Sequence, residues 1–143
     1  MTALNVPACA PLLVFVGAGL GALLRWVFGL WWNGVEPGLP WGTLVANLLG
    51  GLGVGLLLAA LAQAAEAGFS PDAVRAWRLF AVTGFLGGLT TFSTFSAEVV
   101  DFIAHARWAE AAAWAGTHLL GSLALTALGW FLGTLVFQWG ARA

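Results

Sequence analysis

The sequence predicts an all-α integral membrane protein with four transmembrane helices, and three observations support that class. Of its 143 residues, 61% are hydrophobic and only 8% are charged, whereas about a quarter of the residues of a soluble domain are charged. The charges are concentrated between four apolar runs that are each long enough to cross a bilayer. The third run has glycines and hydroxyl residues in its middle, which predicts a helix broken at mid-membrane depth.

The composition also excludes several classes of function. Five arginines, no lysine and a net charge of −1 do not suit a nucleic-acid-binding surface. Cys9 is the only cysteine, so neither an internal disulfide nor a four-cysteine metal site can form. The sequence has no nucleophile–base pair and no metal-ligand spacing, so we do not expect an enzyme. We expect one membrane domain over residues 1–143, with its first apolar run retained as a span.

The first span is expected at residues 11–32, which would be about 33 Å long as a helix. Gly17, Gly19 and Gly21 form a ridge of small residues that suits close contact with another helix. Arg25 lies inside this run and has two interpretations. Its long stem could carry the charge to the membrane interface, or the charge could lie at the mouth of an anion path, because intramembrane charges are usually functional.

The second span is expected at residues 41–64, after a loop of turn-forming residues flanked by tryptophans of an interfacial belt. Thr43 and Asn47 are four residues apart and therefore share one face of this helix. An asparagine at this depth needs a partner. That partner could be a group on a neighbouring helix, or the NH₂ group of Asn47 could bind an anion without carrying a charge.

The third span is expected at residues 73–104, with Ser70 as its N-cap and Pro71 at its first position. Gly87 and Gly88 each cost about 1 kcal/mol of helix propensity, and the β-branched Thr90 and Thr91 follow. We therefore expect the helix to open between Gly87 and Thr90. The alternative is an unbroken helix whose small residues form a packing surface.

Two phenylalanines follow the expected break, among serines and threonines that include Thr94. Phe92 and Phe95 are three residues apart and share a helix face. Glu98 lies three residues further on, on or near the same face. A buried carboxylate is costly, so we expect Glu98 to be protonated, paired with an arginine or turned toward a vestibule.

The fourth span is expected at residues 111–139. His118, Ser122 and Thr126 recur every four residues and form a polar stripe on an otherwise apolar helix. A single hydroxyl would usually bond back to its own helix, but three polar side chains in a row favour a polar track.

The arginines give only a weak positive-inside signal. If the N-terminus is inside, Arg75, Arg78 and Arg142 are inside and Arg107 is outside. Such a chain could insert in both orientations, which predicts an antiparallel homodimer. Four short spans are also too few to enclose a path easily.

At this level of detail, the chain resembles the small bacterial Fluc (CrcB-type) fluoride channels. The resemblance rests on three motifs: GAGLGALLR at residues 17–25, WGTLVAN at 41–47 and GFLGGLTTFSTFSAE at 84–98. The third motif is specific, and the likeness covers nearly the whole chain. It implies a passive fluoride channel of the bacterial cytoplasmic (inner) membrane, built as an antiparallel homodimer with two pores.

The resemblance also assigns roles to residues of this chain. Phe92 and Phe95 match the pore phenylalanines, and Asn47 matches the pore asparagine. The backbone carbonyls of Gly87 and Thr90 match the ligands of a structural sodium ion at the dimer centre. His118 departs from the hydroxyl expected at its position. The full expected fluoride path comprises Arg25, Thr43, Asn47, Phe92, Thr94, Phe95, His118, Ser122 and Thr126.

Two other functions fit the sequence less well than a channel. A small proton-coupled exporter of the multidrug-resistance type needs a carboxylate in its first span, and this first span has none. A structural subunit of a larger membrane complex would leave Asn47, the expected break and the polar stripe unexplained.

Overall fold

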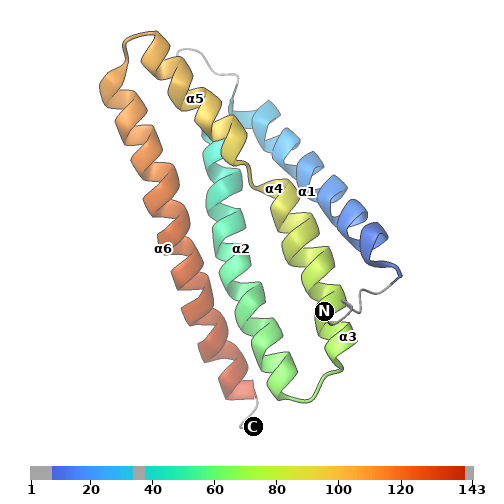
Figure 1. The fold of residues 1–143 in the computed structure, drawn as a ribbon. Coiled ribbons are helices and arrows are strands. Elements are labelled where there is room, and N and C mark those ends of the chain that lie inside the picture. The colour runs from blue at the N-terminus through green and yellow to red at the C-terminus, as the bar shows by residue number, and fades with distance from the viewer. Residues whose placement is uncertain (1–7, 34–37, 141–143) are drawn as a thin grey trace, which may run out of the picture.

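The computed structural model describes residues 8–33 and 38–140, and the regular structure of these residues is entirely helical (Figure 1). Four stretches are long and apolar enough to cross a membrane, which confirms the expected all-α, four-span class. The elements are α1 (Ala10–Trp32), α2 (Trp41–Glu66), α3 (Pro71–Trp77), the π-helical η1 (Arg78–Leu86), α4 (Gly87–Leu89), α5 (Phe92–Ala104) and α6 (Trp108–Gly140). Together α3, η1, α4 and α5 form the third span.

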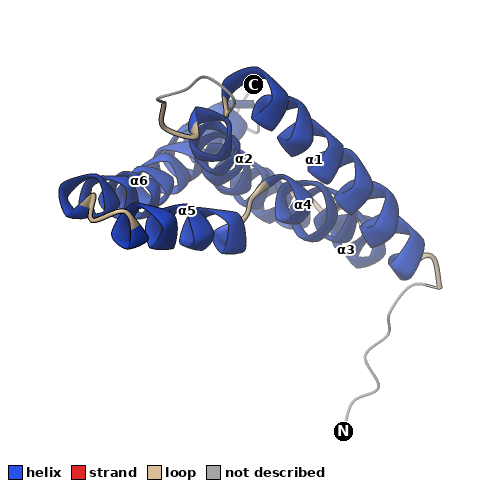
Figure 2. Ribbon diagram, turned by 90° about the horizontal axis from the view of Figure 1, so that it is seen from above, coloured by secondary structure: helices blue, strands red, loops and turns tan. Residues whose placement is uncertain are grey.

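Helix α2 lies at the centre of the bundle. It packs along α6 on one side and against η1 and α4 on the other, while α1 packs along η1 and α4 (Figures 1 and 2). Helix α5 leans away from the line of α4 and packs mainly on α6. The α5–α6 link, the end of α1 and the start of α2 share one end of the molecule, and the α2–α3 link lies at the opposite end.

Glycines bring the helices close enough for backbone contact. A methyl group on Gly17 or Gly21 of α1 would collide with backbone oxygens of η1, and one on Gly55 of α2 would collide with the carbonyl of Thr126 in α6. Gly19 has no neighbour within 4 Å of its Cβ position. The expected ridge of α1 therefore consists of Gly17 and Gly21, while Gly19 faces away from the bundle.

The third span is interrupted at two threonines. Thr90 (φ −80°, ψ 152°) and Thr91 (φ −148°, ψ 119°) are extended, whereas Gly87 and Gly88 remain helical. A methyl group on Gly88 would collide with the backbone of α1 at Ala18. The break therefore lies at the end of the expected segment and not at its glycines. Gly88 serves helix packing, and the β-branched threonines adopt the extended conformation that they favour.

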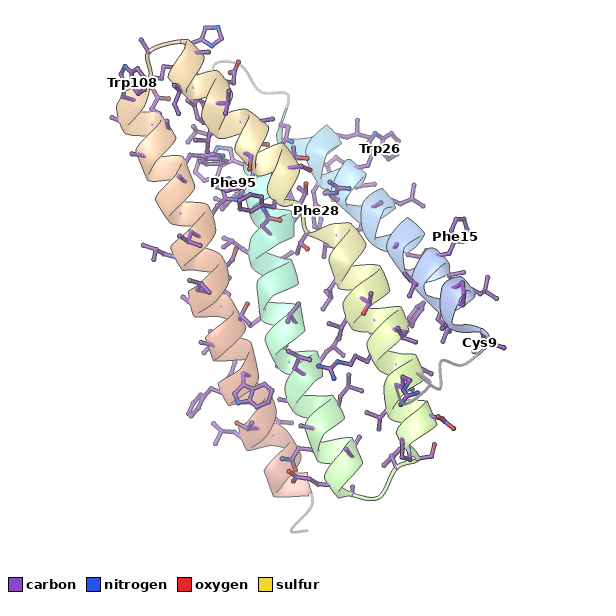
Figure 3. The ribbon with its side chains drawn as sticks, in the orientation of Figure 1. Cys9, Phe15, Trp26, Phe28, Phe95 and Trp108 are labelled. Atoms are coloured by element: carbon purple, nitrogen blue, oxygen red, sulfur yellow. The ribbon has the colours of Figure 1, made fainter. Side chains whose placement is uncertain are left out.

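The ends of the spans follow the expected signals. Ser70 caps α3, because its Oγ accepts a hydrogen bond of 3.2 Å from the Ala73 N–H. Trp31, Trp32 and Trp41 are exposed beside the α1–α2 connection, as an interfacial belt requires. Phe15 and Trp26 point outward from α1 (Figure 3), where a bilayer would cover them.

Candidate ion pathway

A cavity of about 320 Å³ lies beside the break in the third span. Its wall is largely apolar, with a few polar side chains contributed by α2, by the extended threonines of the break and by α6. It brings together six of the nine residues of the expected path. These are Asn47 from α2, Phe92 and Phe95 from α5, and His118, Ser122 and Thr126 from α6.

Asn47 fixes the extended backbone at the break. Its Oδ1 accepts a hydrogen bond of 2.7 Å from the Thr91 N–H, and its Nδ2 donates one of 3.0 Å to the Thr91 carbonyl. The two bonds replace the helical partners that Thr91 loses by being extended. Asn47 is 9% exposed and Thr91 is 7% exposed, so water cannot readily satisfy these groups. Of the two roles considered for Asn47, the inter-helix bond is present in the structure.

The second hydrogen of the Asn47 amide is directed to His118. The distance from Asn47 Nδ2 to His118 Nδ1 is 3.0 Å. The imidazole stacks on Phe95, with ring centroids 4.6 Å apart, and meets Trp114 edge to face at 5.1 Å. His118 is only 3% exposed, and its Nε2 has no hydrogen-bond partner among the described residues. A buried polar atom without a partner costs about 1–3 kcal/mol, so Nε2 is the atom of this network that still lacks a hydrogen bond among the described residues.

The two phenylalanines of α5 form one aromatic unit with different surroundings. Their ring centroids are 5.4 Å apart at an interplanar angle of 68°. Phe95 points from α5 toward α6 (Figure 3) and is partly buried against His118. Phe92 is 78% exposed. The Phe95 side of the cavity is therefore covered by other residues of this chain, whereas the Phe92 side is open.

The polar stripe of α6 reaches the cavity, but its members are not equivalent. The Thr126 hydroxyl donates to the Ser122 carbonyl at 2.8 Å, so it is bonded back to its own helix. His118 is the member that offers an unpartnered nitrogen. The sequence could not distinguish a hydroxyl bonded back to its own helix from a side chain with an unpartnered atom, because the four-residue spacing is the same in both cases.

The other three residues of the expected path line a second hollow of about 370 Å³. Arg25, Thr43 and Thr94 lie there together with Asn33. Thr94 is tied to the N-cap of α5, because its N–H and its hydroxyl lie 3.2 Å and 3.0 Å from the Thr91 hydroxyl. Arg25 is half-buried. The structure thus divides the expected path between two hollows.

Glu98 is held by two uncharged donors. The Thr43 hydroxyl donates to Oε1 at 2.5 Å, and Trp114 Nε1 donates to Oε2 at 3.0 Å. Asn33 Nδ2 in turn donates to the Thr43 hydroxyl at 3.2 Å. Glu98 also lines a hollow of about 570 Å³ with Asp101 and Arg107. The hollow matches the expected vestibule, and a protonated Glu98 stays a prediction.

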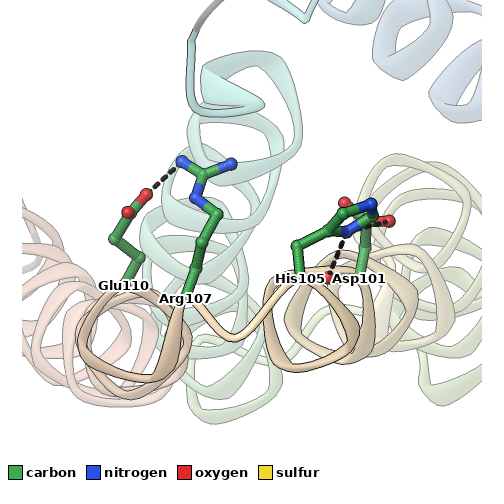
Figure 4. A network of polar contacts seen from close by, with 4 residues as sticks. All are labelled: Asp101, His105, Arg107 and Glu110. Atoms are coloured by element: carbon green, nitrogen blue, oxygen red, sulfur yellow. Dashed lines mark hydrogen bonds and ion pairs between the residues drawn. The ribbon is translucent and has the colours of Figure 1, made fainter.

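Asp101 and Arg107, which line this hollow, each contact a neighbouring polar side chain at the α5–α6 link. Arg107 pairs with Glu110, and His105 Nδ1 lies 3.4 Å from Asp101 Oδ1 (Figure 4). The hydrogen bond to Glu110 raises the pKa of Arg107 above its ordinary value. Arg107 also lies over the ring of Phe102, 4.6 Å from its centroid. It therefore keeps its charge at the rim of the hollow.

Of the two expected sodium ligands, Thr90 lies at the break and Gly87 lies in α4, three residues before it. In an unbroken helix the N–H groups of Thr91 and Thr94 would bond to the carbonyls of Gly87 and Thr90. Here the Thr91 N–H is directed to Asn47 and the Thr94 N–H to the Thr91 hydroxyl. Both carbonyls therefore lose their usual helical donors.

Three residues of the site were not assigned a role from sequence. The backbone of Thr91 donates one hydrogen bond to Asn47 and accepts another from it, and its hydroxyl caps α5. Trp114 donates to Glu98, and Asn33 donates to Thr43. The sequence carries a signal for two of these residues. Trp114 lies four residues before His118 and therefore on the same helix face, and Thr91 has the side chain of an N-cap before a helix.

Comparison with known proteins assigns the chain to a family. The profile of the family described as CrcB-like protein, Camphor Resistance (CrcB), matches residues 12–130. A fluoride-specific ion channel FluC from Burkholderia cenocepacia is 51% identical over 130 residues, covering 91% of each chain. A protein of the same name from Bordetella bronchiseptica is 57% identical over 119 residues, covering 82% of this chain and 86% of its own. With its profile match over most of its length and relatives at this identity, the chain belongs to the CrcB-like family, together with proteins named fluoride-specific ion channels.

Proposed function

We propose that this protein is a fluoride-selective channel, and not an enzyme, that lets fluoride leave the bacterial cytoplasm down its electrochemical gradient. The observation that carries the proposal is the cavity at the break, which Phe92, Phe95 and His118 line together, with the Nε2 atom of His118 buried and unpartnered among the described residues. The relatives named fluoride-specific ion channels support the identity of the ion. Residence in the inner membrane is part of the proposal.

The chemistry of the cavity suits a small, strongly hydrated anion. Such an ion enters a narrow path only if protein donors replace its water. Phenylalanine supplies the positive edge of its ring while remaining apolar. A fixed full charge would hold the anion too firmly, because conduction needs sites that the ion can leave. Uncharged donors beside Phe92 and Phe95 meet both requirements.

The start of α5 at the break adds a favourable electrostatic interaction with an anion in the cavity. Helix α5 begins at Phe92, and Thr91 caps it. The first N–H groups of a helix lack intrahelical partners, and its N-terminus carries a partial positive charge. Thr91 and Phe92 both line the cavity. An anion in the cavity would therefore lie near the positive end of α5.

The direct test is ion efflux from liposomes that contain the purified protein. We expect rapid fluoride efflux, little chloride efflux and no dependence on a proton gradient. A proton-coupled exporter would need that gradient. Equal efflux of the two anions, or efflux only with a proton gradient, would contradict the proposal. Empty liposomes are the control.

We infer further that two antiparallel copies form the working channel. Phe92 is 78% exposed at the open side of the cavity, so a second copy would close a path that one chain leaves open. Tags at the C-terminus should be found on both sides of the membrane, and added arginines in one connection should bias the ratio. Tags on one side alone would exclude the antiparallel arrangement.

A structural sodium ion at the dimer centre is the last part of the proposal. The carbonyls of Gly87 and Thr90 lose their helical donors, and Gly87 is exposed, with room beside it. Carbonyl oxygens of two chains would suit a hard monovalent cation. Exchanging sodium for potassium or choline should weaken assembly or fluoride conduction. Unchanged assembly and conduction would show that the break is stabilised in another way.

A further inference from the structure

The hydrogen bonds of Asn47 identify which atom of its amide is which. A backbone N–H can only donate, so the Asn47 atom 2.7 Å from the Thr91 N–H is the oxygen. A backbone carbonyl can only accept, so the atom 3.0 Å from the Thr91 carbonyl is the NH₂ group. The two bonds agree, and the orientation of the amide follows from the backbone of the break.

This orientation determines the state of His118. The NH₂ group that lies 3.0 Å from His118 Nδ1 can only donate, so Nδ1 must accept and carries no proton. An imidazolium would place an N–H against this NH₂ group. The ring is therefore neutral, and its single proton is on Nε2. That nitrogen is the buried atom without a partner.

We propose that Asn47 is a positioning residue that holds His118, a residue lining the cavity, in its neutral Nε2–H tautomer, so that the unpartnered Nε2–H is the ring group left to donate to an anion that enters there. The rest of the ring is already engaged. Nδ1 faces Asn47, one face stacks on Phe95, and Trp114 packs against the ring. Asn47 thus acts on the ion through His118, and the break at Thr91 sets the direction of the donor. The identity of the anion rests on the proposed function, whereas the tautomer does not.

One substitution reverses the tautomer. In Asn47→Asp, one carboxylate oxygen can still accept from the Thr91 N–H, but the group that faced His118 Nδ1 becomes an acceptor. Nδ1 would then have to carry a proton. In the neutral ring Nε2 would become an acceptor, which repels an anion.

Nitrogen NMR of ¹⁵N-histidine-labelled protein in lipid tests the tautomer without any transport assay. The chain has two histidines, so His105→Gln assigns the signals and serves as a matched control, because His105 is exposed at the α5–α6 link. We expect His118 to show a protonated Nε2 and an unprotonated Nδ1, and Asn47→Asp to protonate Nδ1. An Nδ1–H ring, or an even mixture of tautomers, in the unaltered protein would overturn the proposal.

A pair of His118 variants tests the donor. The amide nitrogen of glutamine can take the place of Nε2, whereas the shorter asparagine reaches only the place of Nδ1. We expect the rate of fluoride efflux through His118→Gln to stay within about tenfold of the rate through the unaltered protein. The rate through His118→Asn should be at least about tenfold lower than the rate through His118→Gln. Equal efflux, or faster efflux in His118→Asn, would overturn the donor role. If the unaltered protein carries no fluoride, the proposed function fails with the donor role, and the NMR result still decides the tautomer.

Discussion

Two hydrogen-bond networks lie one helical turn apart on α2, and they differ in what they hold. Asn47 belongs to the deeper network, whose partners are the backbone of Thr91 and the ring of His118. Thr43 belongs to the outer network, whose centre is the carboxylate of Glu98. The deeper network contains no carboxylate or arginine side chain. The outer network opens to the hollow that Asp101 and Arg107 also line.

The difference shows how one helix face can serve two tasks. Inside a membrane span a full charge is costly, and the network around Asn47 uses amide and imidazole groups to fix a broken backbone. Nearer the end of the molecule, a carboxylate is tolerated because Thr43 and Trp114 both donate to it. We therefore expect changes in the deeper network to abolish conduction and changes in the outer network mainly to affect stability.

The largest effect is expected for Asn47→Asp. The substitution keeps the shape of the side chain but replaces its NH₂ group with an acceptor or a negative charge, so the bonds to the Thr91 carbonyl and to His118 are lost. Fluoride efflux from liposomes should fall to the background level. Gln63→Glu makes the same chemical change near the end of α2 and should leave efflux close to normal. An Asn47→Asp protein that conducts as well as its parent would reduce Asn47 to a helix-packing residue.

A smaller loss is expected when a ring is removed from the aromatic unit. Phe92→Ile and Phe95→Ile keep apolar bulk but remove the positive ring edge, so each should slow fluoride efflux by at least about tenfold while the dimer still assembles. Phe95→Ile should have the larger effect, because that ring also stacks on His118. Phe131→Ile, an exposed position on α6, is the control. Near-normal efflux in both variants would show that the positive ring edges of Phe92 and Phe95 are not needed for fluoride conduction.

The smallest effect on transport is expected in the outer network. Thr43→Val keeps the volume of the side chain but removes the hydroxyl that donates to Glu98 and accepts from Asn33. Loss of that donor should destabilise the fold by about 1–3 kcal/mol, measured as a lower thermal midpoint in detergent. Thr134→Val removes only a local bond to Phe131 and should shift the midpoint less. A Thr43→Val protein as stable as its parent would show that Trp114 alone suffices to hold Glu98.

The fold could be predicted from the sequence because the bilayer restricts the choices. Apolar runs of this length must be helices, and turn-forming residues separate them. The exact place of the break could not be predicted, since Gly88 has a competing role that only packing reveals. Its missing side chain admits the backbone of α1 at Ala18, and the extended conformation falls on Thr90 and Thr91 instead.

The candidate site could be predicted as a set of residues but not as a set of bonds. Spacing placed His118, Ser122 and Thr126 on one face, and all three line the cavity. Spacing could not show that Thr126 is bonded back to its own helix while His118 receives the Asn47 amide. Such contacts join helices far apart in the sequence, so they depend on the tertiary arrangement.

The most direct test of passive fluoride selectivity is the reversal potential of the purified protein in a planar bilayer. Fluoride would be present at a tenfold concentration difference across the bilayer, with chloride equal on both sides. We expect the current to reverse about 59 mV from zero, because a path selective for one monovalent ion follows the gradient of that ion. A reversal potential near zero would show that chloride, which has no gradient, carries most of the current, and an intermediate value would show that both anions permeate. Either result would contradict an account in which the cavity at the break passes fluoride alone.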